Sequence, residues 1–252
     1  MTQAQEDAHL CGITPEHHEP LFLAQHLSAY AFARRLAAGK RVLEIGFGSG
    51  YGLNYLAEVA GETIGIDLAP GNIPRAQAQY RRPNLRFVHM PAAHLDFPDG
   101  SFDLVISFQV IEHIPEREIP AYLAEIRRVL APNGVACLST LNLEHNMKPG
   151  KPYEKLCYHE KEFTGPELHA LLESAFPSVQ LFGLYLSPAQ RLYRRLKKWG
   201  LDLVGPARLN PVARFYAHAT TDSFRVRRGT SPAALDLLAL CRNGASTTGR
   251  VA

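Results

Sequence analysis

The chain has 252 residues, of which 46% are hydrophobic and 20% charged, and this composition excludes a disordered or fibrous protein. The net charge is only +3 at pH 7, and the four cysteines form no CxxC pair, which argues against a zinc knuckle or a disulfide framework. The chain starts without the basic and apolar segments of a signal peptide, and no apolar run approaches about 18 residues, so we expect a cytoplasmic protein without a membrane span.

Apolar residues recur at helical spacing over residues 20–40 and predict a helix before the first strand. The segments that follow alternate between short apolar strands and amphipathic helices: strand 41–46, helix 51–60, strand 63–67, helix 71–80, strands 85–90 and 102–108, helix 119–130 and strand 134–140. This alternation is typical of an α/β fold, in which helices cover both faces of a parallel sheet.

The rhythm changes after residue 141, where a helix over 165–176 precedes strands at 179–186 and 234–242. Between residues 187 and 228 stand ten lysines or arginines and only two aspartates, a local charge of +8. We therefore expect one domain over residues 1–252. It would consist of an N-terminal helical cap (1–40), a core (41–186 plus 231–243) and a basic lid insertion (187–230).

Glycines crowd the turn after the first strand, in the stretch RVLEIGFGSGYG at residues 41–52. A strand that runs through glycines into a helix presents backbone N–H groups to a closely approaching ligand. The dinucleotide pattern G-x-G-x-x-G fails because Tyr51 occupies the third glycine position. Asp67 ends the neighbouring strand and could accept hydrogen bonds from both hydroxyls of a ribose. The pattern thus predicts a nucleotide-like cofactor that contains a ribose.

Four segments in order, VLEIGFGSGYG, IGIDLAP, FPDGSFDLVISFQVIEHI and EIRRVLAPNGVACLST, carry a resemblance to a known family. The sequence resembles the class I S-adenosylmethionine-dependent methyltransferases, in particular the small-molecule, type 11-like group, over residues 20–186. This resemblance implies a Rossmann-like, seven-stranded mixed sheet with helices on both faces. Six strands would be parallel and the last one antiparallel.

The same resemblance assigns roles to residues that would bind S-adenosylmethionine. Glu44 would orient the methionyl amino group, the turn backbone would pack on the cofactor, and Asp67 would bind the ribose. Pro91 stands where the family often has an acid for the adenine amino group, so adenine would depend on the backbone N–H of Ala92, with His94 nearby. The complete implied set is Glu44, Gly46, Gly48, Gly50, Asp67, Leu68, Ala92 and Phe108.

Methyl transfer from a sulfonium is an in-line displacement that depends mainly on alignment, and a general base is needed only when the nucleophile carries a proton. His159 is the first candidate for this base, His113 the second, and Tyr158 lies beside them in the sequence. The alternative interpretation is that His113 caps a helix while Tyr158 and His159 pack the loop. The histidines form no H-x3-H or HExxH arrangement, so we predict no metal.

Leu192, Leu196, Trp199 and Leu203 form an apolar stripe along a predicted helix whose other face is basic. Three interpretations stay open. The helix packs on the core as a lid with a solvated basic face, it captures an anionic substrate, or it makes peripheral contact with an anionic membrane.

The sequence therefore predicts methyl transfer to a small-molecule acceptor, at an oxygen of a sugar, lipid-linked or secondary-metabolite substrate. An RNA methyltransferase is an alternative, although no RNA-binding module is recognisable, and we expect no nucleic-acid partner. A non-catalytic scaffold or regulator that binds S-adenosylmethionine is another, and the intact Glu44, glycines and Asp67 argue against loss of the cofactor. Tyr30 would either reach the carboxylate of the cofactor or pack in the core. The sequence predicts no oligomeric state.

Overall fold

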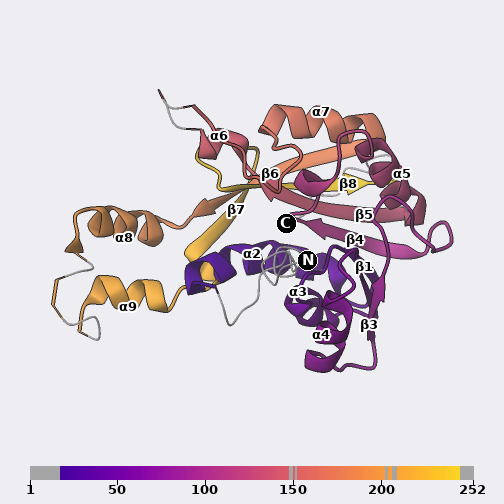
Figure 1. Ribbon diagram of the computed structural model, residues 1–252, viewed down its shortest axis with the longest axis horizontal. Coiled ribbons are helices and arrows are strands. Elements are labelled where there is room, and N and C mark those ends of the chain that lie inside the picture. Colours follow the sequence, from indigo (N-terminus) through magenta and orange to yellow (C-terminus); the bar gives the residue numbers. More distant parts are fainter. Residues whose placement is uncertain (1–17, 148–149, 151, 202–203, 206–208, 245–252) are drawn as a thin grey trace.

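The computed structural model describes residues 18–147, 150, 152–201, 204–205 and 209–244. The first 17 residues of the expected cap, and Leu203 of the expected stripe, lie outside the described residues. A twisted sheet forms the centre of the molecule, helices cover it on both faces, and two helices extend to one side (Figure 1). None of the described helices combines the length and the apolar character needed to cross a membrane.

The sheet has eight strands in the order β3-β2-β1-β4-β5-β8-β6-β7. β1 to β6 run parallel to one another, and β8 lies antiparallel between β5 and β6, as expected for the last strand. The strands are β1 (Arg41–Ile45), β2 (Glu62–Asp67), β3 (Leu85–His89), β4 (Phe102–Phe108), β5 (Leu130–Leu141), β6 (Ser178–Leu186), β7 (Phe224–Arg228) and β8 (Asp236–Arg242).

The expectation of seven strands is wrong by one, because β7 adds an antiparallel edge strand to β6. β7 lies within the segment expected to be an insertion. Its side chains alternate, with Phe224 buried and Val226 half-buried on one side and Arg225 and Arg227 exposed on the other. Five residues that include three arginines give too short an alternating pattern to be distinguished from a basic loop.

The expected helices lie close to their predicted positions, and the sequence analysis missed α6, α9 and the 3₁₀ turns η1 and η3. The helices and 3₁₀ turns are α2 (Pro20–Ala37), α3 (Tyr51–Ala57), α4 (Asn72–Gln79), η1 (Ile111–His113), α5 (Ile119–Val129), α6 (Leu143–Asn146), α7 (Gly165–Ala175), α8 (Pro188–Lys198), α9 (Pro211–Ala217) and η3 (Thr221–Ser223). Residues at the N-termini of several helices determine where these helices begin. α7 begins with a capping box in which Thr164 and Glu167 exchange hydrogen bonds, and α2 and α8 each begin with a proline in the first turn.

Apolar side chains form a separate core on each face of the sheet. α5 and α7 pack on one face, where Tyr122, Leu123, Leu168 and Leu172 are buried against the strands. α2 and α3 cover the other face, where Ala33 is fully buried, and a smaller cluster joins α3 and α4 to β3. Since both faces are covered, ligands can reach the sheet only at its edges and at the ends of its strands.

Candidate active site

The glycine turn lies at the end of β1 and approaches its neighbours too closely for side chains. Gly46, Gly48 and Gly50 have φ values of 74°, 58° and 84°, in the left-handed region that favours glycine. A Cβ atom at Gly46 would come within 2.5 Å of the Val110 side chain, which follows β4. The turn and the loop after β4 are therefore packed tightly against each other.

Asp67 connects this turn to the end of β2. Its Oδ2 accepts a hydrogen bond from the Gly48 N–H at 2.8 Å, and its Oδ1 accepts one from the Ala69 N–H at 2.8 Å. Burial raises the pKa of the Asp67 carboxyl, and the two backbone donors act in the opposite direction. Each carboxylate oxygen has a second acceptor position, so two further hydroxyl donors can be accommodated. The structure thus brings together the two features that the sequence paired.

Glu44 points to the site from β1 and is completely buried. Its Oε1 accepts a hydrogen bond from the Tyr30 hydroxyl at 2.5 Å, whereas its Oε2 has no hydrogen-bond partner among the described residues. Burial raises the pKa of Glu44 to about 8. A buried acid with one unsatisfied oxygen is a favourable neighbour for a cation.

Tyr30 belongs to α2 and covers Glu44. Its ring meets the rings of Phe108 and Tyr51 edge-on, at centroid distances of 5.0 and 5.7 Å. A Cβ atom at Gly52 would lie 2.0 Å from the Tyr30 ring, so the last glycine of the motif allows Tyr30 to lie against α3. The hydrogen bond to Glu44 was not expected from the sequence, which contains no signal that pairs a residue of the first helix with a particular strand end.

The remaining residues assigned to the cofactor surround the same strand ends. Leu68 follows Asp67 with 69% of its surface exposed, Ala92 is half-buried after β3, and Phe108 is buried at the end of β4. Gln109, which the sequence analysis missed, has a φ of +55°. Such backbone conformations in non-glycine residues are frequent at functional sites, and no sequence pattern announces them.

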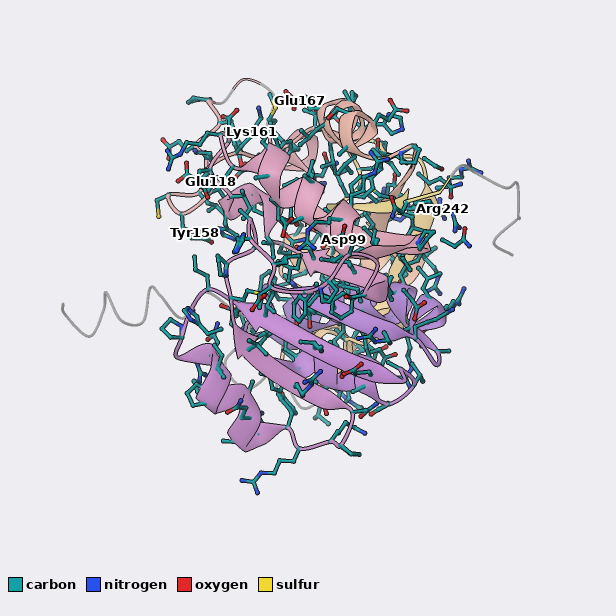
Figure 2. The ribbon with its side chains drawn as sticks, turned by 90° about the vertical axis from the view of Figure 1, so that its right-hand side faces the viewer. Asp99, Glu118, Tyr158, Lys161, Glu167 and Arg242 are labelled. Atoms are coloured by element: carbon teal, nitrogen blue, oxygen red, sulfur yellow. The ribbon has the colours of Figure 1, made fainter. Side chains whose placement is uncertain are left out.

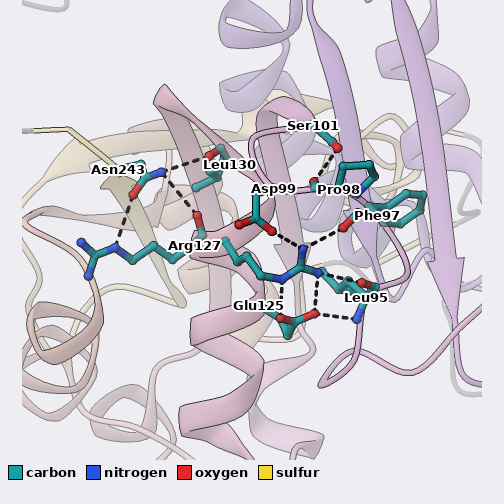
Figure 3. A network of polar contacts seen from close by, with 10 residues as sticks. Leu95, Phe97, Pro98, Asp99, Ser101, Glu125, Arg127, Leu130 and Asn243 are labelled. Atoms are coloured by element: carbon teal, nitrogen blue, oxygen red, sulfur yellow. Dashed lines mark hydrogen bonds and ion pairs between the residues drawn. The ribbon is translucent and has the colours of Figure 1, made fainter.

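Arg128 of α5 fixes the loop that contains Ala92. Its guanidinium donates to the carbonyl oxygens of Leu95 and Phe97 at 2.7 and 2.8 Å and to the carboxylates of Glu125 and Asp99 (Figure 3). Glu125 also accepts from the Leu95 N–H at 2.8 Å, and its hydrogen bonds to Arg128 lower its pKa to about 2. The adenine side of the predicted site therefore has a firm support although it lacks the usual acid.

His113, Tyr158 and His159, the three predicted catalytic residues, form a second cluster. The backbone N–H groups of Glu160 and Lys161 donate to the Glu112 carbonyl oxygen at 2.7 and 3.2 Å and join the two segments. The ring of His159 lies 4.9 Å from both the His113 ring and the Tyr158 ring. Tyr158 is the exposed member of the cluster and lies at the edge of the molecule in Figure 2.

His159 forms a buried pair with Glu162, and the sequence analysis missed this partner. The His159 Nδ1 and the Glu162 Oε1 are 2.6 Å apart, and the residues are 7% and 6% exposed. Burial raises the pKa of Glu162, and the hydrogen bond that its carboxylate accepts from the Leu156 N–H acts in the opposite direction; the Tyr153 hydroxyl donates to it as well. Burial, with His113 and Lys155 nearby, lowers the pKa of His159 to about 4. A neutral imidazole that donates from Nδ1 carries its lone pair on Nε2.

Two further buried acids, Glu112 and Asp236, lie at this end of the sheet. Glu112 is 1% exposed, its Oε2 has no hydrogen-bond partner in the described chain, and burial raises its pKa to about 8. Asp236 begins β8 opposite Leu141 and accepts from the Gln25 side chain at 2.8 Å, and burial raises its pKa to about 6. One side-chain nitrogen or oxygen atom from each of Glu112, His113 and His159 could bind a metal ion, and these atoms lie within 4.8 Å of one another. The spacing of the three residues in the sequence does not reveal this grouping.

Comparisons with known proteins agree with this geometry. A family model described as a methyltransferase domain matches residues 43–138. A probable S-adenosylmethionine-dependent methyltransferase of Mycolicibacterium smegmatis is 36% identical over 157 residues, which cover 62% of this chain and 59% of that protein. A ubiquinone biosynthesis O-methyltransferase of Azorhizobium caulinodans is 31% identical over 122 residues, covering 48% and 47%.

A phthiotriol/phenolphthiotriol dimycocerosates methyltransferase of Mycobacterium leprae is 32% identical over 149 residues, which cover 58% of this chain and 51% of that protein. The chain therefore spans about half to three fifths of the length of these curated relatives.

Solved structures share the fold at low identity. A possible histamine N-methyltransferase of Thermotoga maritima superposes with a TM-score of 0.60 at 17% identity, covering 88% of this chain and 92% of that chain. The [4+2]-cyclase SpnF gives a TM-score of 0.58 at 17% identity, covering 93% and 86%. Such a fold hosts more than one reaction, so the family assignment depends on the sequence matches as well. The sequence matches identify residues 43–138 as a methyltransferase domain similar to that of S-adenosylmethionine-dependent methyltransferases, and the solved structures show that the chain shares their fold.

Proposed function

We propose that this chain transfers the methyl group of S-adenosylmethionine to an oxygen of a small-molecule acceptor that binds at the His159 cluster. The observation that carries the proposal is the buried His159–Glu162 pair, in which Glu162 holds Nδ1 and leaves Nε2 with a lone pair. A hydroxyl nucleophile needs such a base because its proton must be removed. One relative is named an O-methyltransferase, which supports the choice of oxygen.

The residues at the ends of β1 and β2 suit the cofactor. The Glu44 Oε2, which has no hydrogen-bond partner in the described part of the chain, would accept from the amino group of the cofactor, and the Asp67 carboxylate would accept from the ribose hydroxyls. Gly46, Gly48 and Gly50 would present backbone to it, Leu68 an exposed apolar surface, and Ala92 and Phe108 backbone groups at its two ends. When bound, S-adenosylmethionine supplies an electrophilic methyl group on a positively charged sulfur.

The His159 cluster would then handle the acceptor. Nε2 of His159 takes the hydroxyl proton as the oxygen–carbon bond forms and the sulfur–carbon bond breaks, and the Glu162 carboxylate stabilises the resulting imidazolium. His113 is held by a contact between its Nδ1 and the Tyr158 carbonyl oxygen at 3.0 Å. We assign His113 and Tyr158 to contact with the acceptor, and most of the alignment comes from these fixed positions.

Methyl transfer from S-adenosylmethionine with a tritiated methyl group tests the proposal directly. Paired acceptors that differ only in a hydroxyl or an amine at one position should be offered together with a lipid-linked hydroxyl compound. We expect label in the hydroxyl compounds and none in the amines. Label in the amines, label only in RNA, or cofactor binding without transfer to any acceptor would each contradict the proposal.

The raised pKa of Glu44 predicts that cofactor binding releases a proton. The free protein holds Glu44 largely protonated at pH 7, whereas a bound ammonium group favours the carboxylate, so affinity should increase from pH 6 to pH 7.5 by up to about tenfold per pH unit. Titration calorimetry in buffers of different ionisation enthalpy measures the released proton. Glu44→Gln should abolish the release. Binding without proton release in the unchanged protein would refute the assignment.

The predicted absence of a metal gives a second test. The Nδ1 atoms of His159 and His113 already contact Glu162 and the Tyr158 carbonyl, and the raised pKa of Glu112 keeps this carboxyl largely protonated at neutral pH. Metal sites need deprotonated ligands. We therefore expect methyl transfer to survive dialysis against EDTA unchanged. Loss of activity that Mg²⁺ or Zn²⁺ restores would instead make Glu112, His113 and His159 a ligand set.

A cytoplasmic location is also part of the proposal. Cys137, Cys157 and Cys241 are free thiols, as is usual for proteins in a reducing compartment.

A further inference from the structure

α8 and α9 form a hairpin that extends away from the sheet (Figure 1), and its described residues lie within 188–217. The two helices pack on each other through Tyr193 and Phe215, whose rings stack at 3.8 Å with an interplanar angle of 6°. Gln190 is the buried residue of α8. Of the three interpretations of the apolar stripe, packing on the core does not hold for Leu192 and Trp199, which point to solvent, and Leu196 is half-buried.

The hairpin collects exposed apolar side chains. Large apolar residues with more than a third of their surface exposed include Leu192 (54%), Trp199 (75%), Leu201 (39%), Val204 (64%) and Leu209 (77%). Single exposed apolar residues are normal on a soluble protein, but a group of this kind on one projecting element marks an interaction surface. The partner must offer apolar contact.

The same hairpin is strongly basic. α8 contains no acidic residue, and its five cations, Arg191, Arg194, Arg195, Lys197 and Lys198, are all exposed. Arg191, Arg194, Arg195 and Lys198 form no salt bridge with a described residue. Arginines on the exposed side of β7 extend the positive surface. The partner must therefore be anionic as well as apolar.

We propose that the α8–α9 hairpin docks on the surface of an anionic lipid bilayer. Trp199 and the exposed leucines would enter the boundary between headgroups and acyl chains, where tryptophan is favoured, and the α8 cations would contact headgroup phosphates. RNA would satisfy the cations but not the apolar group, which favours lipid. The docking of the hairpin does not depend on the proposed function. Only its consequence, that the acceptor is carried in a membrane, rests on that function.

Trp199 is the only tryptophan of the chain, so its fluorescence reports on the hairpin alone. Vesicles of phosphatidylcholine with phosphatidylglycerol should shift its emission to shorter wavelength and co-sediment the full-length protein, and added salt should weaken both effects. Vesicles of phosphatidylcholine alone should bind at least about tenfold more weakly, since the electrostatic contribution is missing. Equal binding to both, or binding to neither, would overturn the proposal.

Arg194→Glu with Arg195→Glu should weaken binding to the anionic vesicles by at least about tenfold, because two attractive charges become repulsive. Arg75→Glu with Arg81→Glu is the matched control, since Arg75 in α4 and Arg81 just after it are both exposed and carry the same charge change. It should leave binding unchanged within about twofold. Equal loss in both pairs would mean that net charge, and not the hairpin, decides the binding.

Two further measurements separate the alternatives. An RNA oligonucleotide that binds tightly while vesicles do not, or a blue shift that depends only on protein concentration and signals a second copy, would each overturn lipid docking. Calorimetric binding of S-adenosylmethionine to the same variants is expected to remain within about twofold of the unchanged protein, because the hairpin lies outside the glycine turn. Vesicle binding without methyl transfer would reject the proposed function and leave the docking intact.

Discussion

Asp67→Ala is expected to weaken S-adenosylmethionine binding by roughly 100-fold, which corresponds to about 3 kcal/mol for two hydrogen bonds to a charged acceptor. The loss should be large because Asp67 has two tasks. It would accept from the ribose hydroxyls, and it already accepts from Gly48 and Ala69 and so connects the glycine turn to the end of β2. Titration calorimetry measures the change.

Two variants distinguish these tasks. Asp67→Asn keeps one carbonyl oxygen for a backbone donor but loses the charge, and we expect an intermediate loss of affinity. Asp103→Ala removes the same side chain at the opposite end of the sheet, where Asp103 accepts from the Arg41 N–H at 2.9 Å. Asp103→Ala should bind the cofactor as the unchanged protein does. Equal affinity in Asp67→Ala and the unchanged protein, with both folded by circular dichroism, would remove the ribose assignment.

Most of the fold could be predicted because local patterns and global architecture agree. A buried parallel strand such as β4 is a largely apolar run between turn signals, and α5 has a clear apolar face. β7 was not predicted, because its alternating pattern is short and consists largely of arginines. β7 can pair with β6 only because the α8–α9 hairpin brings the chain back to the edge of the sheet. The spacing of residues in the sequence does not specify this return.

The sequence analysis named residues at fixed positions in a motif, and these lie together in the structure, but it missed contacts between distant segments. Glu44, the glycines and Asp67 follow two adjacent strands, so their proximity follows from the parallel order of β1 and β2. Tyr30 reaches Glu44 across the α2–β1 connection, and Asp236 reaches the site because β8 runs antiparallel. Two glutamates close to His159 in the sequence, Glu160 and Glu162, could each have paired with it. The conformation of the loop places Glu162, and not Glu160, at Nδ1 of His159.

His159→Ala is expected to reduce the turnover number by about a hundredfold or more while the affinity for S-adenosylmethionine stays unchanged, because it removes the base but not the cofactor contacts. Added imidazole should restore part of the activity. Turnover should be measured at saturating cofactor, so that the titration of Glu44 does not contribute. Unchanged turnover would assign His159 to packing of the loop, and loss of cofactor binding would show that the variant disturbs the fold.

The Glu162→Gln variant tests whether Glu162 stabilises the charge on His159 or only packs the loop. The amide oxygen can still accept from Nδ1 of His159, so the ring should keep its place, but the charge that stabilises the imidazolium is gone, and we expect a roughly tenfold fall in turnover. With its pKa of about 4, His159 should give a rate that is flat above about pH 5 and falls below it as the imidazole becomes protonated. Removing a nearby negative charge destabilises the protonated form, so the acid limb in Glu162→Gln should move to lower pH. If Glu162 only packed the loop, its replacement would lower the stability of the fold but would not move the acid limb of the pH–rate profile. The pH at which the rate falls in Glu162→Gln therefore decides whether Glu162 acts through His159.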